Sequence, residues 1–286
     1  PKGSKKRSRS TKRLKKKEQG ATPAQSKKVL RETKKVPATV IPAPFDIEEA
    51  QNIVFQPNAG PQTDYLASSE REVLYGGAAG GGKSYATLAD PLRNLNHQDF
   101  SGLLVRHTTE ELRELIQKSQ ELYPKAIPGI KWSERKSQWV TPRGGRIWMS
   151  YLDKDQDVMR YQGQAFNYIA FDELTQWATP FAWNYMRSRL RSAAPELGLY
   201  MRATTNPGSI GHAWVKKMFI DPSEPNKPFW ATDIETGDTL AYPRGHTKEG
   251  QPLFRRRFIP ASLFDNPYLA DSGDYETMLL SMPEHQ

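Results

Sequence analysis

The run EVLYGGAAGGGKSYATL, from Glu72 to Leu88, constrains the fold of this chain more than any other stretch of its sequence. It reads as a short apolar strand, a glycine-rich loop and the start of a helix. The loop fits the pattern G-x-x-x-x-G-K-[ST], in which backbone N–H groups and a helix N-terminus surround phosphate groups. Because the glycines let the backbone turn inward around the phosphates, we expect a nucleotide site at this turn.

Each position of this loop has an expected task. The lysine of the pattern, Lys83, would reach the β- and γ-phosphates, and the hydroxyl of Ser84 would hold Mg²⁺. The alternative is a glycine-rich turn that matches by chance, but the apolar strand before the loop and the helix-compatible run after it favour a nucleotide. We therefore expect ATP and Mg²⁺ as cofactors. The loop residues expected to bind the nucleotide are Gly77, Ala78, Ala79, Gly80, Gly81, Gly82, Lys83 and Ser84.

The sequence YIAFDE, at residues 168–173, is the second feature that indicates chemistry. Its apolar residues predict a buried strand, and the two carboxylates come at the C-terminal end, where a parallel sheet binds its ligand. Asp172 would bind the water shell of Mg²⁺, and Glu173 would act as the general base that polarises the attacking water. An Asp-Glu pair alone often caps a helix, but together with the glycine loop it favours ATP hydrolysis.

A third predicted strand, LYMRAT from Leu199 to Thr204, is followed by the sequence Thr-Asn-Pro-Gly. Small hydroxyl and amide groups at such a strand end can sense the γ-phosphate and transmit its loss along the strand. We therefore expect Thr204, Thr205 and Asn206 to couple hydrolysis to movement. The alternative is a simple turn, since Asn-Pro-Gly is a common turn sequence.

Gln62 precedes the glycine loop and would lie on a short helix of residues 62–69. Its amide can read the edge of an adenine ring with two hydrogen bonds, and Tyr65 or Phe55 could stack on that ring. The alternative is an exposed glutamine on a helix surface. Gln62 is thus a candidate adenine-binding residue.

One arginine is expected to neutralise the charge that develops in the transition state of phosphoryl transfer. Arg160 lies in the segment before the carboxylate strand, followed by Gly163, and could project toward the nucleotide of a neighbouring subunit. Arg106, at the end of the predicted strand GLLVR, is the competing candidate. Arg187 and Arg191 are expected to share one face of a helix after the carboxylates, a solvated or DNA-facing surface rather than a catalytic one.

The order of the predicted elements points to an α/β fold with a twisted, mainly parallel sheet and helices on both faces. After the glycine loop come a helix that is bent or ends near Pro91, the strand GLLVR, and a helix from Thr109 to Leu122 that Pro124 and Pro128 stop. Residues 138–152 read as two strands joined by Pro-Arg-Gly-Gly, which is a hairpin signal.

The charge of the chain is concentrated at its beginning. The full sequence carries 41 Lys and Arg against 32 Asp and Glu, a net charge of +9. Residues 1–36 hold 15 of the basic residues and 2 of the acidic ones, a local charge of 15 − 2 = +13. Such a segment should be a disordered basic tail that binds a polyanion, with nucleic acid as the first candidate. A solvated linker, a protein-docking arm and a localisation signal are the alternatives.

Composition also predicts how the rest of the chain is divided. Residues 37–61 read as a proline-rich connector, and residues 62–220 as a P-loop ATPase core. Residues 221–286 read as a lid and linker region, with β-hairpins, a strand from Arg255 to Pro260 and a last short helix that opens at Asp265.

Other residue types exclude several kinds of site. The chain has no cysteine, which excludes disulfides and thiolate zinc sites, and its 5 histidines never fall at metal-ligand spacing. No apolar run is long enough to span a membrane, so no membrane partner is expected. Mg²⁺ is then the only metal that we expect.

With these motifs in place, the chain resembles the ATPase half of the large terminase subunit of tailed bacteriophages. The resemblance covers about residues 50–285. Walker motifs are common to many ATPases, whereas the TTNPG sequence and the last segment are more specific. The matching segments are the Gln62 region as adenine motif, GGAAGGGKS as Walker A, YIAFDE as Walker B, ATTNPG as coupling motif, and RRRFIPASLFDNPYL.

The resemblance implies a P-loop NTPase of the additional-strand type with a small lid subdomain. It implies an ATPase that powers translocation of double-stranded DNA into a procapsid, as a homo-oligomeric ring on the portal protein, a pentamer in many members. A small terminase subunit would be a further partner, and the location would be the host cytoplasm with transient docking on the procapsid. A nuclease domain would follow Gln286, but no second acidic cluster is present here. Many relatives have an arginine in the Walker A loop, where this chain has Ala78 and Ala79.

Two other functions stay open at this point. A helicase-like nucleic-acid translocase shares both Walker motifs but should carry further helicase motifs, which we do not find. A nucleotide-gated DNA-binding assembly module would bind ATP and hydrolyse very little of it. DNA-stimulated hydrolysis separates the module from the motors, and dependence on a portal-bearing procapsid separates packaging from strand separation.

Overall fold

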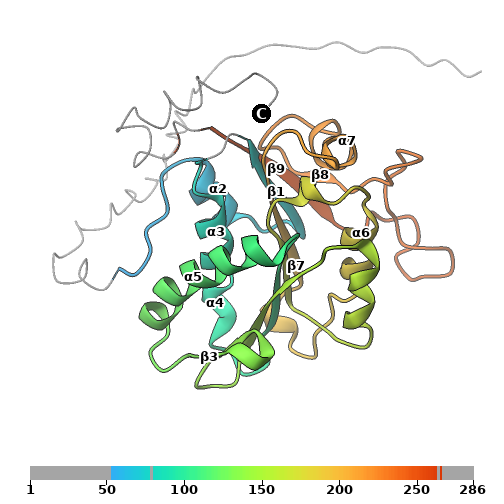
Figure 1. Cartoon of the computed structure of the whole chain (residues 1–286). Helices are drawn as coiled ribbons and strands as arrows, with labels where there is room; N and C mark the ends of the chain where they lie inside the picture. Colours follow the sequence, from blue (N-terminus) through green and yellow to red (C-terminus); the bar gives the residue numbers. More distant parts are fainter. Residues whose placement is uncertain (1–52, 78–79, 263–264, 266–286) are drawn as a thin grey trace, which may run out of the picture. The chain divides into compact units, whose positions relative to one another are not determined.

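A computed structural model of the chain describes residues 53–77, 80–262 and 265 (Figure 1). These residues all lie within one unit of the chain, Ile47–Gln286. The predicted basic tail, most of the proline-rich connector, Ala78, Ala79 and the helix expected after Asp265 fall outside them. What the sequence predicts for them therefore stays a prediction.

The centre of the described structure is one mixed sheet. Its strands are β1 (Glu72–Gly77), β2 (Ser101–Arg106), β3 (Lys131–Ser133), β4 (Gln138–Val140), β5 (Arg146–Tyr151), β6 (Tyr168–Phe171), β7 (Tyr200–Thr205), β8 (Phe229–Trp230) and β9 (Arg255–Ala261). They lie in the order β3-β4-β5-β2-β6-β7-β1-β9-β8. The strands from β5 across to β9 run parallel, and antiparallel pairs form both edges.

Helices cover both faces of this sheet. They are α2 (Pro61–Ala67), α3 (Lys83–Ala89), α4 (Leu92–Leu95), α5 (Thr109–Ala126), α6 (Phe181–Arg187) and α7 (His212–Val215). The helices α3, α4 and α5 lie on one side, and α6 and α7 on the other (Figure 1). Among the described residues, no helix has both the length and the apolar character needed to cross a membrane.

The strand β6 illustrates why the middle of the sheet is parallel. All of its residues, YIAF, are buried. Ile169 and Phe171 belong to the core cluster that contains Trp183 of α6, whereas Tyr168 belongs to the opposite cluster with Leu115 of α5. Burial on both sides is typical of parallel strands between two helix layers. The predicted α/β fold class is confirmed.

The strand β7 lies between β1 and β6, so the strand before the glycine loop and the strand before the carboxylates are not neighbours. This strand order is the one expected of an additional-strand P-loop fold. Because β1, β6 and β7 run parallel, their C-terminal ends meet at one edge of the sheet. We call this edge the nucleotide end and the opposite edge, where these strands begin, the start end.

The helix α5 differs from its prediction at its last turn. It begins where expected, with a reciprocal capping box at its first turn. It does not stop at Pro124 but continues to Ala126. In the last turn a proline removes only one hydrogen bond. The fully buried side chain of Tyr123, and the bond from the Ile127 N–H to the Tyr123 carbonyl (2.9 Å), hold that turn in place.

Part of the segment expected as a lid and linker is built into the sheet. The strand β9 lies beside β1, so the sheet extends beyond the predicted core boundary at residue 220. Arg256 of β9 pairs with Glu72 at the beginning of β1, and β8 pairs with this same part of β9. The loops between β8 and β9 therefore flank the start end of β1, away from the glycine loop (Figure 1).

Candidate nucleotide-binding site

The glycine loop follows β1 and leads into α3. Gly77 has a φ of 139°, and a Cβ there would lie 1.9 Å from the carbonyl oxygen of Ala261 on β9. Since neither backbone can move aside without breaking the pairing of β1 with β9, this position requires glycine. Gly82 also has a left-handed backbone, with a φ of 73°. The two glycines thus turn the chain sharply from the strand into the helix.

Gln62 lies against this loop, and both ends of its amide are engaged. The residue is 4% exposed. Its Nε2 donates to the Gly82 carbonyl (3.0 Å), and its Oε1 accepts from the Asn58 N–H (2.6 Å). The side chain therefore ties the segment before α2 to the start of α3. Two hydrogen bonds to adenine would require these contacts to open, and the adenine role of Gln62 stays a prediction.

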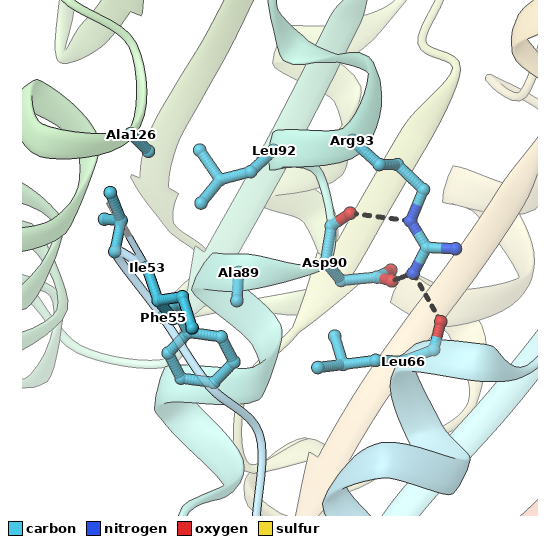
Figure 2. Close-up of a pocket in the computed structure, with 9 residues that line it drawn as sticks. Ile53, Phe55, Leu66, Ala89, Asp90, Leu92, Arg93 and Ala126 are labelled. Carbon is cyan, nitrogen blue, oxygen red and sulfur yellow. Dashed lines mark hydrogen bonds and ion pairs between the residues drawn. The ribbon is translucent and has the colours of Figure 1, made fainter. Parts of the chain in front are cut away.

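The two aromatic residues expected near adenine lie in different places. Tyr65 is fully buried and stacks on Tyr75, with 5.1 Å between the ring centroids. Tyr75 in turn donates from its hydroxyl to the Gly81 carbonyl (2.9 Å), so this pair supports the loop from the core. Phe55 lines a separate pocket of about 520 Å³ beside Ala89, at the far end of α3 from the loop (Figure 2).

Ser84 and Asp172 join the glycine loop to the carboxylate strand. The Ser84 hydroxyl donates to Asp172 Oδ2 (3.2 Å), and the Thr204 hydroxyl donates to Asp172 Oδ1. Asp172 itself is fully buried. Burial lowers the pKa of Lys83, which precedes Ser84, while the charges of Glu173 and Asp172 oppose this change. The predicted phosphate and metal residues are thus brought together.

Glu173 follows with a left-handed backbone, at a φ of 63°. This conformation costs a residue with a side chain on the order of 1 kcal/mol, so surrounding contacts must hold it. The Asn206 N–H donates to Glu173 Oε2, and the Asn206 side-chain amide donates to Oε1, each at 2.9 Å. Burial raises the pKa of Glu173 and the charge of Asp172 raises it further, against the opposing effect of Lys83. A raised pKa makes Glu173 a better proton acceptor.

The end of β7 carries all the predicted coupling residues into the site. The Thr204 hydroxyl accepts from the Glu173 N–H (3.0 Å) in addition to its bond with the neighbouring carboxylate. The hydroxyls of Thr205 and Thr175 lie 2.9 Å apart, and Thr175 also donates to the Asn206 carbonyl (3.2 Å). Any displacement of the end of β7 will therefore move the glutamate and its backbone.

The two candidate arginines lie in different surroundings. Arg106, at the end of β2, is 7% exposed, and its guanidinium lies 2.7 Å from Asp172 Oδ2. Its buried Nε has no hydrogen-bond partner. Arg160 belongs to a 3₁₀ helix of residues 155–161, where it pairs with Asp157 (3.1 Å) and lies over the ring of Tyr151. Its side chain is 41% exposed. Of the two arginines, Arg106 pairs with Asp172 at the end of the carboxylate strand, whereas Arg160 pairs with Asp157 of its own 3₁₀ helix.

The helix after the carboxylates does not place Arg187 and Arg191 on one face. The helix α6 ends at Arg187, and Arg191 lies beyond it, where it donates to the Gln164 carbonyl (3.1 Å). Arg187 pairs instead with the buried carboxylate of Glu72 at the beginning of β1. The prediction of a shared helical face is wrong, because the helix ends before its second member.

Some contacts of the site have little or no signal in the sequence. The hydroxyl of Thr175, which joins the site to β7, is marked only by its place just after the two carboxylates. The Gln176 amide donates to Glu111 in the first turn of α5, a partner 65 residues away. No local pattern predicts that bond, which braces the carboxylate turn against the helix that follows β2.

The oxygen atoms of Ser84 and Asp172 suit Mg²⁺, which prefers oxygen ligands and keeps waters and phosphate oxygens in its shell. Within the part of the chain that the structure describes, no group of three or more His, Cys, Asp or Glu residues could hold a metal ion. A hydroxyl and a carboxylate at a phosphate loop are the protein ligands expected of a nucleotide-bound Mg²⁺. The donor set therefore fits that ion.

Comparisons with known proteins show which family and which fold this chain resembles. The family described as "Terminase large subunit, T4likevirus-type, N-terminal" matches residues 74–248. The large terminase from a thermophilic bacteriophage is similar at a TM-score of 0.55 and 16% identity, over 80% of this chain and 52% of that chain. Its complex with ADP gives a TM-score of 0.53 and 14% identity, over 79% and 50%.

The large terminase ATPase domain from Thermus phage P74-26 gives a TM-score of 0.52 and 10% identity, over 84% of this chain and 94% of that domain. No curated protein sequence matches the chain. The chain spans about half the length of the large terminase in the first two structures. These likenesses support the additional-strand P-loop fold, and the family match covers more than half of the chain. The chain therefore belongs to the family of terminase large subunits, in their N-terminal region, as the resemblance in its sequence predicted.

Proposed function

We propose that this chain hydrolyses ATP and thereby powers the translocation of double-stranded DNA into a procapsid. The observation that carries the proposal is the hydrogen-bonded unit at the nucleotide end, which joins the ends of the parallel strands β6 and β7 to the helix start after the glycine loop. A phosphate loop, a metal-binding carboxylate and an oriented glutamate are the parts that phosphoryl transfer to water requires. The unit consists of Ser84, Asp172, Glu173, Thr204 and Asn206.

Lys83 and the backbone N–H groups of the loop would hold the phosphates. Burial disfavours the charged form of Lys83, and an anionic phosphate would favour it again, so the binding of nucleotide and the charge of Lys83 are linked. Ser84 and Asp172 would hold Mg²⁺, which neutralises phosphate charge when it is bound. The glycine loop, Lys83 and Ser84 thus account for binding rather than for the proton transfer.

Glu173 would accept the proton of the attacking water. Its raised pKa makes it a stronger base than an exposed glutamate, and the two bonds from Asn206 orient its carboxylate. Because Asn206 and Thr204 belong to or adjoin β7, loss of the γ-phosphate would change their contacts with the carboxylates. The strand would then carry that change toward the rest of the sheet.

Two arginines would serve different nucleotides. Arg106 lies close enough to Asp172 to act on the site of its own chain. Arg160 is exposed and pairs with Asp157 rather than with Asp172, so its proposed target is the ATP of an adjacent subunit. Each guanidinium would stabilise negative charge on the transferring phosphoryl group. A role in trans for Arg160 requires an assembly in which its surface meets the nucleotide end of a neighbour.

The family suggests the larger assembly. We infer a homo-oligomeric ring, with a pentamer as the first candidate, docked on the portal protein of a procapsid in the host cytoplasm. The small terminase subunit and double-stranded DNA would be its other partners. The basic tail of residues 1–36 would add affinity for DNA without sequence preference, because lysines meet phosphates and read no base edges.

The test is ATP hydrolysis by the purified chain with and without duplex DNA. We expect hydrolysis that DNA stimulates, and its loss in Lys83→Ala but not in Lys136→Ala, which removes an exposed lysine far from the loop. Translocation is then measured as nuclease-protected DNA in portal-bearing procapsids, with the complete large subunit as the motor.

Each alternative function gives a different result. ATP binding without measurable hydrolysis, with or without DNA, would favour a nucleotide-gated assembly module. Strand separation of a duplex in the absence of procapsids would favour a helicase-like translocase. DNA-stimulated hydrolysis that supports protection of DNA in procapsids and separates no strands is the outcome expected of a packaging motor.

A further inference from the structure

Arginines and aromatic rings gather at the start end of the sheet, beside β8 and β9. Three guanidinium groups surround the ring of Phe254, with their central carbons 5.4–5.9 Å from its centroid. A fourth stacks on the ring of Trp230 at 4.7 Å. The set, called here the Phe254 cluster, consists of Arg71, Arg187, Arg255, Arg256, Phe254 and Trp230.

The cluster carries more positive charge than its ion pairs neutralise. Glu72 pairs with Arg187 and with Arg256, whose Nε lies 2.8 Å from Glu72 Oε2. Among the described residues, neither Arg71 nor Arg255 has an ion-pair partner. One carboxylate thus pairs with two of the four guanidinium groups that lie over the rings of Phe254 and Trp230. Because like charges held together repel, an anion that entered here would be stabilised.

The cluster is separate from the nucleotide site. Arg256 pairs with Glu72 at the first residue of β1, and Arg255 pairs with Trp230 of β8. The glycine loop begins at the other end of β1, so about 17 Å of strand separates the two, at about 3.3 Å per residue. A ligand of the cluster would therefore not compete with ATP for the same atoms.

The chemistry of the cluster suits phosphate groups. A guanidinium that stacks on an aromatic ring keeps the N–H groups at its edge free, and that fork matches two phosphate oxygens. Arg255 is exposed, and Trp230 is 43% exposed, so this part of the cluster faces solvent. Several such forks close together fit a ligand with repeated phosphates better than they fit a single ion.

We propose that the Phe254 cluster binds the phosphate backbone of a polynucleotide. Arg71 and Arg255 provide the free charge, while Arg187 and Arg256, fixed by Glu72, hold Phe254 in place. The stacked guanidinium groups would meet the phosphate oxygens of the polynucleotide rather than the edges of its bases. The binding is therefore independent of nucleotide sequence. The site lies outside the nucleotide site and does not depend on ATP hydrolysis.

The experiment compares two double variants of the full chain. Arg71→Gln with Arg255→Gln removes the unpaired charges of the cluster. Arg135→Gln with Arg143→Gln removes the same charge from exposed positions near β3 and β4, at the opposite edge of the sheet. Binding to a labelled duplex is measured over a range of salt concentrations without nucleotide. The basic tail is present in every protein, so its contribution cancels.

Each phosphate contact contributes about −0.9 to the slope of log K against log salt on a duplex and about −0.7 on a single strand. The cluster variant should therefore lose about 2 from the slope on a duplex, whereas the control variant should keep the slope of the unmodified chain. A single strand of the same length is the second ligand. The slope that the cluster variant loses on this ligand shows whether the cluster contacts the backbone of one strand or of two.

Further measurements separate binding from folding. Arg71→Lys with Arg255→Lys keeps the charge and should retain most of the slope. All variants should unfold at nearly the same urea concentration, because neither arginine has an ion pair to lose and each loses only one ring contact. ATP binding should be unchanged in each variant, which keeps this result independent of the proposed hydrolysis. Equal slopes for the cluster and control variants, on both ligands, would overturn the proposal.

Discussion

The two ends of the central parallel strands both bury charged residues, but with opposite electrostatic results. At the start end, burial alone would raise the pKa of Glu72, yet Arg187 and Arg256 outweigh it and hold that pKa below its ordinary value. At the nucleotide end, burial raises the pKa of Glu173 and lowers that of Lys83. The charge of Glu72 is thus compensated within the fold, whereas burial disfavours the charged forms of both Glu173 and Lys83.

This difference separates structural charge from functional charge. A carboxylate held by two guanidinium groups is stable as it stands, and it joins β1, β9 and α6. Burial disfavours the charged forms of Glu173 and Lys83, and a bound metal ion and a bound phosphate would favour those forms again. Two groups whose pKa values are shifted in this way would favour the binding of phosphate and metal at the nucleotide end. The predictions below test the two ends of the sheet separately.

The largest expected effect concerns the two arginines of the nucleotide end. Arg160→Ala should lower the rate of ATP hydrolysis about 10³- to 10⁵-fold, as loss of an arginine finger does, with ATP binding mostly retained. Mixing Arg160→Ala with Lys83→Ala should restore part of the activity, because an intact pocket then meets a neighbour that still has its arginine. Single-turnover hydrolysis of the mixture measures this.

Arg106→Ala is the matched comparison, since this arginine contacts Asp172 in the nucleotide site of its own chain. Mixing Arg106→Ala with Lys83→Ala should restore nothing, because every intact pocket then lacks its own Arg106. Recovery in the Arg106 mixture, or none in the Arg160 mixture while subunits exchange, would contradict the division of roles between the two residues.

The next effect separates the base from the phosphate ligand. Glu173→Gln should lower the rate about 10²- to 10⁴-fold and leave ATP bound, since it removes proton transfer and leaves Ser84 and Asp172 intact. Lys83→Ala should weaken ATP binding as well as hydrolysis. Equilibrium binding of a fluorescent ATP analogue measures the first property and phosphate release the second. Near-normal hydrolysis by Glu173→Gln would rule out Glu173 as the base.

The third prediction tests the start end as a structural site. Glu72→Gln should lower the free energy of unfolding by about 3–5 kcal/mol, because it leaves Arg256 buried without its carboxylate. Glu134→Gln, at an exposed position, is the control. Urea unfolding at neutral pH gives both values. A loss equal to that of the control would mean that Glu72 adds nothing to the fold.

The unmodified chain and Glu72→Gln should also differ in how their free energy of unfolding depends on pH. Because the folded-state pKa of Glu72 lies below its unfolded value, its stabilisation is present above the unfolded pKa and is lost as the pH falls through the folded pKa. The unmodified chain should therefore lose more stability on acidification than Glu72→Gln does. Parallel loss in the two proteins would contradict the assignment.

The smallest effect is a shift in the pH profile of hydrolysis. A general base must be ionised, and burial raises the pKa of Glu173 above the ordinary 4.5. The rate should therefore fall on acidification at a higher pH than an exposed glutamate would give, and the fall should be absent from the residual rate of Glu173→Gln. Single-turnover rates at saturating ATP measure the pH profile. A fall in rate centred at or below the ordinary pKa of a glutamate would contradict the prediction.

Local patterns in the sequence are sufficient for much of the fold and of the site. A glycine loop between an apolar run and a helix start, and apolar runs that end in Asp-Glu or Thr-Asn, specify their own backbone geometry. The residues needed are adjacent, so Lys83, Ser84, Asp172 and Glu173 could be named, and the strands that precede them placed, before any contact was known. Parallel strands then bring these ends to one edge.

The partners of those residues were decided only by the tertiary structure. Glu72 meets Arg256, which lies 184 residues away, because β9 enters the sheet beside β1, and it also meets Arg187 of α6, which lies 115 residues away. The bonds of Gln62 to the loop, and the separation of Arg106 from Arg160, likewise depend on which strands become neighbours. An alternation of apolar residues or a glycine pattern predicts the backbone conformation of one segment. The order of the strands depends on the burial of both faces of the sheet, and every segment contributes to that burial at once.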